Sequence, residues 1–342
     1  MRYREFPKNK DIKVSEVGFG VWSVATNWWG VKDEKMAIDL LQYASDRGVN
    51  FYDTADVYGL GYGETILPKA FPDSRDKRVY ATKFGYDIDS GVLEERTGHS
   101  ELRQKFLAND IRYSCEQSLK RLKTDYIDIY QLHNPRLDFI NGDEVVDTLE
   151  ALIREGKIRS YAMALGPDIG WLEEGIVSMD HNPIALHVIY NLLEQEPMKF
   201  LFDKARETNT GLMIRVPHAS GLLDGSITEK LDLDKDDHRS HRKRMWIDAG
   251  VDVLRDFDFL LEHDRTIGQA AILFALAEKS ACSVFPNFTK RAEIDEFCAT
   301  SDLKELQEEE LKKIDDLWIE KHAKVLTSLV FHGDSSNKPT PR

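Results

Sequence analysis

The chain has 342 residues, of which 42% are apolar and 31% charged, a composition typical of a globular protein with a large core. With 46 basic and 60 acidic residues, its net charge of −14 repels phosphate, which argues against a nucleic-acid or anionic-membrane partner. Three cysteines without a C-x-x-C spacing argue against a disulfide framework or a structural zinc site.

Short β-rich runs alternate along the chain with helical patterns such as Ile111, Cys115, Leu119 and Leu122. Strand–helix units in strict succession require parallel pairing, and eight of them close a (β/α)8 TIM barrel. A doubly wound open sheet competes with this prediction, but no G-x-G-x-x-G follows the first strand. The eight predicted strands are Val14–Phe19, Val49–Asp53, Arg78–Lys83, Tyr126–His133, Lys157–Ala164, Ile184–Tyr190, Gly211–Pro217 and Cys282–Pro286.

Two long loops, 87–102 and 219–247, follow the third and seventh predicted strands, on the face where barrel enzymes carry their chemistry. No linker divides the chain, so we expect one barrel domain over 1–330, with a helix at Lys304–Lys321 and a disordered tail at 331–342. The chain begins without an apolar signal sequence, and no run approaches the length of a membrane span, so a cytoplasmic location is expected.

Four polar residues stand at or just after the ends of neighbouring predicted strands: Asp53, Tyr58, Lys83 and His133. Tyrosine is a poor acid at neutral pH, but a nearby ammonium stabilises the phenolate and an aspartate can hold that ammonium in place. The histidine can hydrogen-bond the reacting oxygen. Taken singly, Asp53 could be a helix cap, Lys83 a surface charge and His133 a core histidine; their shared position favours a proton-donating site.

These residues fall in segments that resemble the aldo-keto reductase family: 49–59 its aspartate–tyrosine motif, Ala81–Lys83 its lysine strand, and 118–128 with Gln131–His133 its histidine segment. The resemblance covers roughly residues 1–320. It implies hydride transfer between a nicotinamide cofactor and an aldehyde or ketone, with Tyr58 as general acid, Lys83 and Asp53 as its tuners, and His133 as the orienting group.

The resemblance also implies a cofactor site at the barrel mouth. Lys290 and Arg291 supply positive charge for a 2′-phosphate, which favours NADP over NAD, whereas Glu293 would repel that phosphate or accept a ribose hydroxyl. The implied cofactor-binding residues are Gly20, Val21, Trp22, Ala164, His187, Arg215, Pro217, Ala219, Ser220, Gly221, Leu222, Pro286, Asn287, Thr289, Lys290, Arg291 and Glu296.

Three strand ends depart from the family pattern. Ala164-Leu165 stands where Ser-Asn is common, His187 where a glutamine is usual, and Arg215 where an aromatic stacks under the nicotinamide. The Arg215 plane could stack on the ring, in which case its charge would disfavour the oxidised cofactor, or it could point at a carboxylate.

The expected substrate pocket has aromatic walls, which suit an apolar or sugar-like carbonyl compound; its residues are Trp22, Trp28, Trp29 and Tyr86. The basic stretch 238–244 could clamp phosphates or an anionic substrate, or be a solvated loop or subunit contact. No metal is expected, because arginines flank the His238 and His241 pair.

The sequence thus predicts a carbonyl reductase. A redox-sensing subunit that holds cofactor with little turnover is the alternative, and an aldolase with Lys83 as Schiff-base lysine is disfavoured because Asp53 would keep that amine charged. The oligomeric state stays open.

Overall fold

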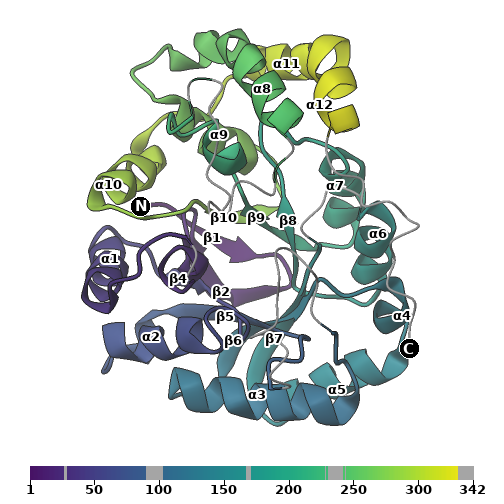
Figure 1. Ribbon diagram of the computed structural model, residues 1–342. Coiled ribbons are helices and arrows are strands. Elements are labelled where there is room, and N and C mark those ends of the chain that lie inside the picture. The colour runs from purple at the N-terminus through teal and green to yellow at the C-terminus, as the bar shows by residue number, and fades with distance from the viewer. Residues whose placement is uncertain are drawn as a thin grey trace.

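The computed structural model describes residues 1–26, 29–89, 103–166, 171–227, 229, 242 and 244–329. Eight strands form one parallel sheet in chain order, and its edges meet where Val17 lies beside Val284. Val284 N donates to the Glu16 carbonyl (2.8 Å) and Gly18 N to the Val284 carbonyl (2.9 Å), so the sheet closes as the predicted (β/α)8 barrel (Figure 1). The strands are β3 (Phe19–Gly20), β4 (Phe51–Asp53), β5 (Val79–Phe84), β6 (Ile127–His133), β7 (Ile158–Ala164), β8 (Ala185–Ile189), β9 (Gly211–Arg215) and β10 (Ala281–Phe285).

Helices surround the strands (Figure 1). They follow the expected 3.6-residue spacing: α3, for example, buries Ile111, Cys115, Leu119 and Leu122. The helices are α1 (Glu34–Asp46), α2 (Tyr62–Ala70), α3 (Ala108–Leu122), α4 (Leu137–Ile140), α5 (Asp143–Arg154), α6 (Leu172–Asp180), α7 (Met198–Glu207), α8 (Arg244–Val253), α9 (Ile267–Leu276), α10 (Arg291–Cys298), α11 (Glu308–Leu317) and α12 (Ala323–Leu329).

An N-terminal hairpin corrects the first predicted strand. Seven predicted strands lie within two residues of the observed bounds, but Val14–Phe19 straddles two elements. Its first residues end β2 (Asn9–Ser15), which pairs antiparallel with β1 (Tyr3–Phe6), and its last residue begins β3. Burial alternates over residues 11–14, as in a strand with one solvent-exposed face, and this pattern is distinct from the apolar runs of the barrel strands.

The hairpin packs its apolar side chains into the base of the barrel. Phe6, Ile12 and Val14 are fully buried in one cluster with inward-facing strand residues such as Phe51 and Phe285. A separate, larger cluster lies between the strands and the helices. Apolar side chains of the hairpin and the strands therefore fill the barrel interior below the mouth.

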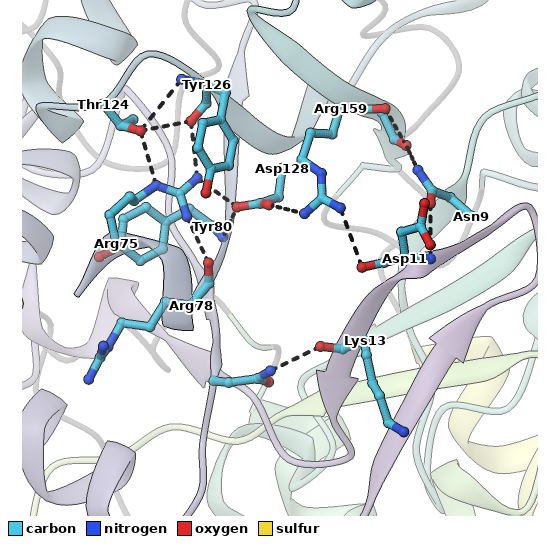
Figure 2. A network of polar contacts seen from close by, with 12 residues as sticks. Asn9, Asp11, Lys13, Arg75, Arg78, Tyr80, Thr124, Tyr126, Asp128 and Arg159 are labelled. Atoms are coloured by element: carbon cyan, nitrogen blue, oxygen red, sulfur yellow. Dashed lines mark hydrogen bonds and ion pairs between the residues drawn. The ribbon is translucent and has the colours of Figure 1, made fainter.

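A polar network around Asp128 of β6 links it to Tyr80 of β5 and Arg159 of β7 at the base of the barrel (Figure 2). Arg75 lies between the rings of Tyr80 (4.3 Å) and Tyr126 (4.2 Å) and donates to the buried Asp128 carboxylate (2.6 Å). The other oxygen of Asp128 accepts from Arg159 (2.8 Å). Charged residues at this end of a barrel stabilise the fold.

The ends of the loop after β5 lie side by side, since Asp87 N donates to the Arg103 carbonyl (2.9 Å) and Lys105 N to that of Gly85 (2.7 Å). Most of the predicted 87–102 insertion, much of 219–247 and the predicted tail 331–342 lie outside the described residues. The predicted helix Lys304–Lys321 is observed from Glu308 as α11 and a π-helical turn at Trp318–His322, and α12 continues it beyond the predicted end. In the described part of the chain, no helix is long and apolar enough to cross a membrane.

Candidate active site

The C-terminal ends of β4, β5 and β6 bring the four predicted catalytic residues together. Asp53 ends β4, Lys83 lies near the end of β5, His133 ends β6, and all three are buried. Tyr58 lies on the turn between β4 and α2, where its backbone N donates to the Ala55 carbonyl (3.1 Å). Gly59 makes this turn possible: its φ is +57°, and a Cβ there would lie 2.6 Å from the Ala25 carbonyl oxygen.

Lys83 is the centre of the cluster and is completely buried. Its ammonium donates to Asp53 Oδ2 (2.5 Å), the Thr54 carbonyl (2.8 Å) and the Tyr58 hydroxyl (3.5 Å). The three N–H groups therefore have three acceptors, which satisfies a buried ammonium. A positive charge is held against the phenol oxygen, as the proton-donating arrangement requires.

Gln131 donates a hydrogen bond to the second carboxylate oxygen of Asp53. It lies on β6 beside Lys83, is fully buried, and its Nε2 donates to Asp53 Oδ1 (2.8 Å). Its Oε1 lies 3.2 Å from His187 Nδ1. The sequence analysis gave Gln131 no role, although its two-residue spacing from His133 places both on the inner face of the strand.

His133 is a neutral hydrogen-bonding group at this mouth. Burial, reinforced by the positive charges of Lys83 and Arg215, holds the pKa of His133 well below its usual value of 6.5. Its ring lies edge-on to Tyr58 (6.1 Å between centroids) and to Tyr86 (5.0 Å). An uncharged imidazole can orient an oxygen without carrying a proton of its own to the reaction.

Aromatic side chains stand where the substrate wall is predicted. The rings of Trp22 and Trp29 stack at 5.1 Å, and the Tyr86 hydroxyl accepts from Asn134 Nδ2 (2.7 Å). The stacked pair gives a rigid flat surface. Trp28 lies outside the described residues.

The predicted cofactor residues fall at the same end of the barrel. Gly20, with Val21 and Trp22 after it, ends β3; Ala164 ends β7; His187 is in β8; and Arg215 ends β9. The remainder lie just beyond β9 and β10 or in α10: Pro217, Ala219, Ser220, Gly221, Leu222, Pro286, Asn287, Thr289, Lys290, Arg291 and Glu296.

Arg215 is anchored to the backbone. Its Nη2 donates to the carbonyls of Leu165 (2.6 Å) and Gly166 (2.8 Å) at the end of β7, and the side chain is half-buried. Both of these partners are backbone carbonyl oxygens in the segment after β7. The two hydrogen bonds hold the guanidinium close enough for its positive charge to act on His133 and His187.

The segment after β10 is organised around a helix start. Glu293 Oε2 accepts from Thr289 N (2.7 Å), Thr289 Oγ1 (3.0 Å) and Lys290 N (3.3 Å), so the carboxylate caps α10. The side chain of Lys290 is 66% exposed. Arg291 makes a bidentate ion pair with Asp39 of α1, which raises the pKa of Arg291.

Two further charged residues, Glu296 and Arg242, are engaged by neighbouring side chains. Glu296 accepts from Thr266 Oγ1 (2.6 Å) at the start of α9. Arg242, from the predicted basic stretch, contacts the buried carboxylate of Glu194 and donates to Ser220 Oγ (3.2 Å). An internal ion pair therefore accounts for the charge of Arg242, and most of the stretch lies outside the described residues.

A second buried polar cluster behind β5 went unpredicted. Glu64 accepts from Thr82 Oγ1 (2.6 Å) and Arg121 Nε (2.5 Å). Burial, with Glu64 nearby, raises the pKa of Asp56 well above its usual value. Among the described residues, no group of three or more histidine, cysteine or acidic side chains could hold a metal ion.

Comparisons with known proteins agree with this geometry. Residues 16–319 match the family model described as the aldo/keto reductase family. The chain is 32% identical over 237 residues to aldo-keto reductase YhdN of Bacillus subtilis (67% of this chain, 66% of that protein) and 31% identical over 234 residues to an NADH-specific methylglyoxal reductase of Escherichia coli (64% and 68%). The holo form of aldo-keto reductase AKR11C1 from Bacillus halodurans is similar in structure, with a TM-score of 0.73, 26% identity, and coverage of 93% of this chain and 96% of that one.

Proposed function

Because the chain belongs to the aldo/keto reductase family, and is therefore a nicotinamide-dependent oxidoreductase of aldehydes and ketones, we propose that Tyr58, Lys83, Asp53 and His133 carry out its reaction. The observation that supports this is the ammonium of Lys83, held between the Asp53 carboxylate (2.5 Å) and the Tyr58 hydroxyl (3.5 Å). A redox-sensing subunit with little turnover is not favoured, since all four residues proposed for proton donation are present at the mouth.

A bound reduced nicotinamide would supply the hydride that the carbonyl carbon accepts, and would itself be oxidised. Tyr58 donates its hydroxyl proton to the carbonyl oxygen, which completes the alcohol. The adjacent Lys83 ammonium stabilises the phenolate that Tyr58 becomes, and Asp53 keeps that ammonium charged and oriented. His133, held neutral by its lowered pKa, hydrogen-bonds the same oxygen and fixes its direction.

The mouth fits a nicotinamide group. Nε2 of His187 is buried and has no hydrogen-bond partner in the described part of the chain. Register places His187 beside Ala164, which in turn lies beside His133, so this polar atom is level with the catalytic residues. A carboxamide would give it a partner, which is the role that we propose for His187.

We further propose NADP over NAD, with Lys290 as the 2′-phosphate contact. Lys290 is 66% exposed and its ammonium lies 3.7 Å from Glu293 Oε1, a longer contact than the bidentate pair that Arg291 makes with Asp39. The Glu293 carboxylate is itself engaged at the start of α10. The proposed substrate is a carbonyl compound that can lie against the stacked Trp22 and Trp29 rings and Tyr86.

The test is Tyr58→Phe, with Tyr62→Phe as the matched control. Tyr62 is four residues away and its hydroxyl donates to Glu34 at the surface (3.1 Å). With nitrobenzaldehyde as substrate, we expect Tyr58→Phe to lose about 10²–10⁴-fold in turnover while retaining cofactor affinity, measured by tryptophan quenching. Near wild-type turnover of Tyr58→Phe would contradict its role, and loss of turnover in Tyr62→Phe as well would point to a structural effect.

A further inference from the structure

We propose that Gln131 is a positioning residue that fixes the ring tautomer of His187, so that a lone pair on His187 Nε2, and never an N–H, faces the carboxamide of the cofactor. The carboxamide contact rests on the proposed function; the tautomer does not. The observation is the hydrogen-bonded series Asp53–Gln131–His187 in the upper layer of the barrel, where all three side chains are buried.

Along this hydrogen-bonded series, the donor or acceptor role of each atom follows from the role of the atom before it. Asp53 accepts from the Lys83 ammonium and is a carboxylate, so it can only accept hydrogen bonds. The atom of Gln131 that lies 2.8 Å from Asp53 Oδ1 must therefore be the NH₂ group, which leaves the carbonyl oxygen facing His187. A carbonyl oxygen also only accepts, so His187 Nδ1, 3.2 Å away, must carry the ring proton.

The second nitrogen of His187 is then an acceptor, because the ring is neutral. The ring is enclosed in the barrel, with Phe285 5.3 Å away and the positive charges of Lys83 and Arg215 nearby, and these surroundings disfavour a second proton. A neutral imidazole with hydrogen on Nδ1 has a lone pair on Nε2. That buried nitrogen can accept an N–H of a carboxamide and would reject its oxygen, which sets one orientation of the nicotinamide ring.

Gln131 also separates the histidine from the aspartate. His187 Nδ1 lies 3.7 Å from Asp53 Oδ1, too far for a hydrogen bond but close enough for direct contact after a small shift. Without the amide between them, the ring N–H could turn to Asp53 and compete with Lys83 for the carboxylate. Gln131 thereby keeps Asp53 dedicated to the ammonium beside Tyr58.

The primary test is the ¹⁵N NMR spectrum of histidine-labelled wild-type protein, with His187→Gln to identify the signal among ten histidines. We expect a pyrrole-type Nδ1 and a pyridine-type Nε2 for His187, unchanged between about pH 5.5 and 8. Observation of hydrogen on Nε2 in the wild type would overturn the proposal, and this measurement needs no variant of Gln131 to fold.

Two variants then test the cause. Gln131→Met keeps the volume and removes both hydrogen bonds, so the His187 signals should shift toward a mixture of tautomers. Gln131→Glu places a carboxylate beside Nδ1, so His187 should take up a second proton near neutral pH. Gln42→Glu, an exposed glutamine bonded to the Ala70 carbonyl, is the control for added charge and should leave the His187 signals unchanged.

Cofactor affinity provides the second readout. Both Gln131 variants should bind NADPH about tenfold more weakly by tryptophan quenching, since one buried hydrogen bond loses its geometry. Unchanged His187 tautomers in both variants would refute the positioning role. If the tautomers behave as expected but no carbonyl compound is reduced by the wild type, the proposed function fails while the role of Gln131 in the tautomer stands.

Discussion

Replacement of Lys83 by methionine separates catalysis from stability at this site. The ammonium is fully buried and donates to Asp53, the Thr54 carbonyl and Tyr58. Methionine has a similar length and no charge. Lys83→Met therefore leaves the Asp53 carboxylate in the barrel with Gln131 as its remaining donor among these residues.

The structure sets the expected magnitudes. An uncompensated buried charge costs about 3–5 kcal/mol, so the free energy of unfolding of Lys83→Met should fall by that amount. Turnover should fall by about 10²–10⁴-fold, since the phenol loses the ammonium that stabilises its conjugate base. Urea unfolding followed by tryptophan fluorescence measures the first quantity, and cofactor oxidation measured by absorbance gives the second.

A double variant, Asp53→Asn with Lys83→Met, tests the reasoning. It removes both charges, so most of the lost stability should return, because the asparagine oxygen can still accept from Gln131. Turnover should stay low, because the phenol still lacks its ammonium. Wild-type stability in Lys83→Met, or recovery of turnover in the double variant, would show that the ion pair does not act as described.

Three further outcomes follow from the charges at the mouth. Burial lowers the pKa of His133 and His187 well below 6.5, so below that pH the folded state binds fewer protons than the unfolded chain. The free energy of unfolding should therefore fall on acidification below pH 6.5, by about 1.4 kcal/mol per pH unit for each histidine. The urea midpoint of His187→Gln should depend less on pH than that of the wild type. Lys290→Ala should weaken NADPH binding more than NADH binding in fluorescence titrations, whereas Arg291→Ala should change both little; equal effects of the two variants would remove the distinction. Arg215→Met should improve affinity for NADP⁺ relative to NADPH, because it removes a positive charge near the ring, and an unchanged ratio would mean that the charge is screened.

The barrel could be predicted because its signals are local. Seven strands are short apolar runs, and apolar residues recur about every 3.6 positions in the helices between them. Each of these elements can therefore be predicted from its own residues alone. The first strand failed because an antiparallel hairpin runs directly into it. Residues 11–14 of β2 alternate in burial, and β3 begins four residues after the last residue of β2. Only Glu16, Val17 and Gly18 lie between the two strands, so the sequence predicts a single strand there.

Site residues could be predicted from the sequence where a charged or polar side chain ends an apolar strand. Asp53, Lys83 and His133 stand out because a polar group there needs a partner or a purpose. Gln131 carries no charge and lies in the segment whose resemblance points to His133, so its own role is visible only through its contacts. The partner of Arg291 is Asp39, 252 residues earlier in the chain, and no local pattern reports such a pair.

Glu293 shows how one residue can support opposite conclusions at the two levels. In the sequence, the carboxylate of Glu293, three residues after Lys290, argues against binding of a 2′-phosphate, because like charges repel. In the fold it is the third residue of α10 and accepts hydrogen bonds from the backbone N–H groups of Thr289 and Lys290 and from the Thr289 hydroxyl, which hold its carboxylate at the helix start. The helix thus accounts for an acidic side chain here whichever cofactor binds. The presence of Glu293 then carries little weight against NADP, and the preference depends on Lys290 and on how firmly Asp39 retains Arg291.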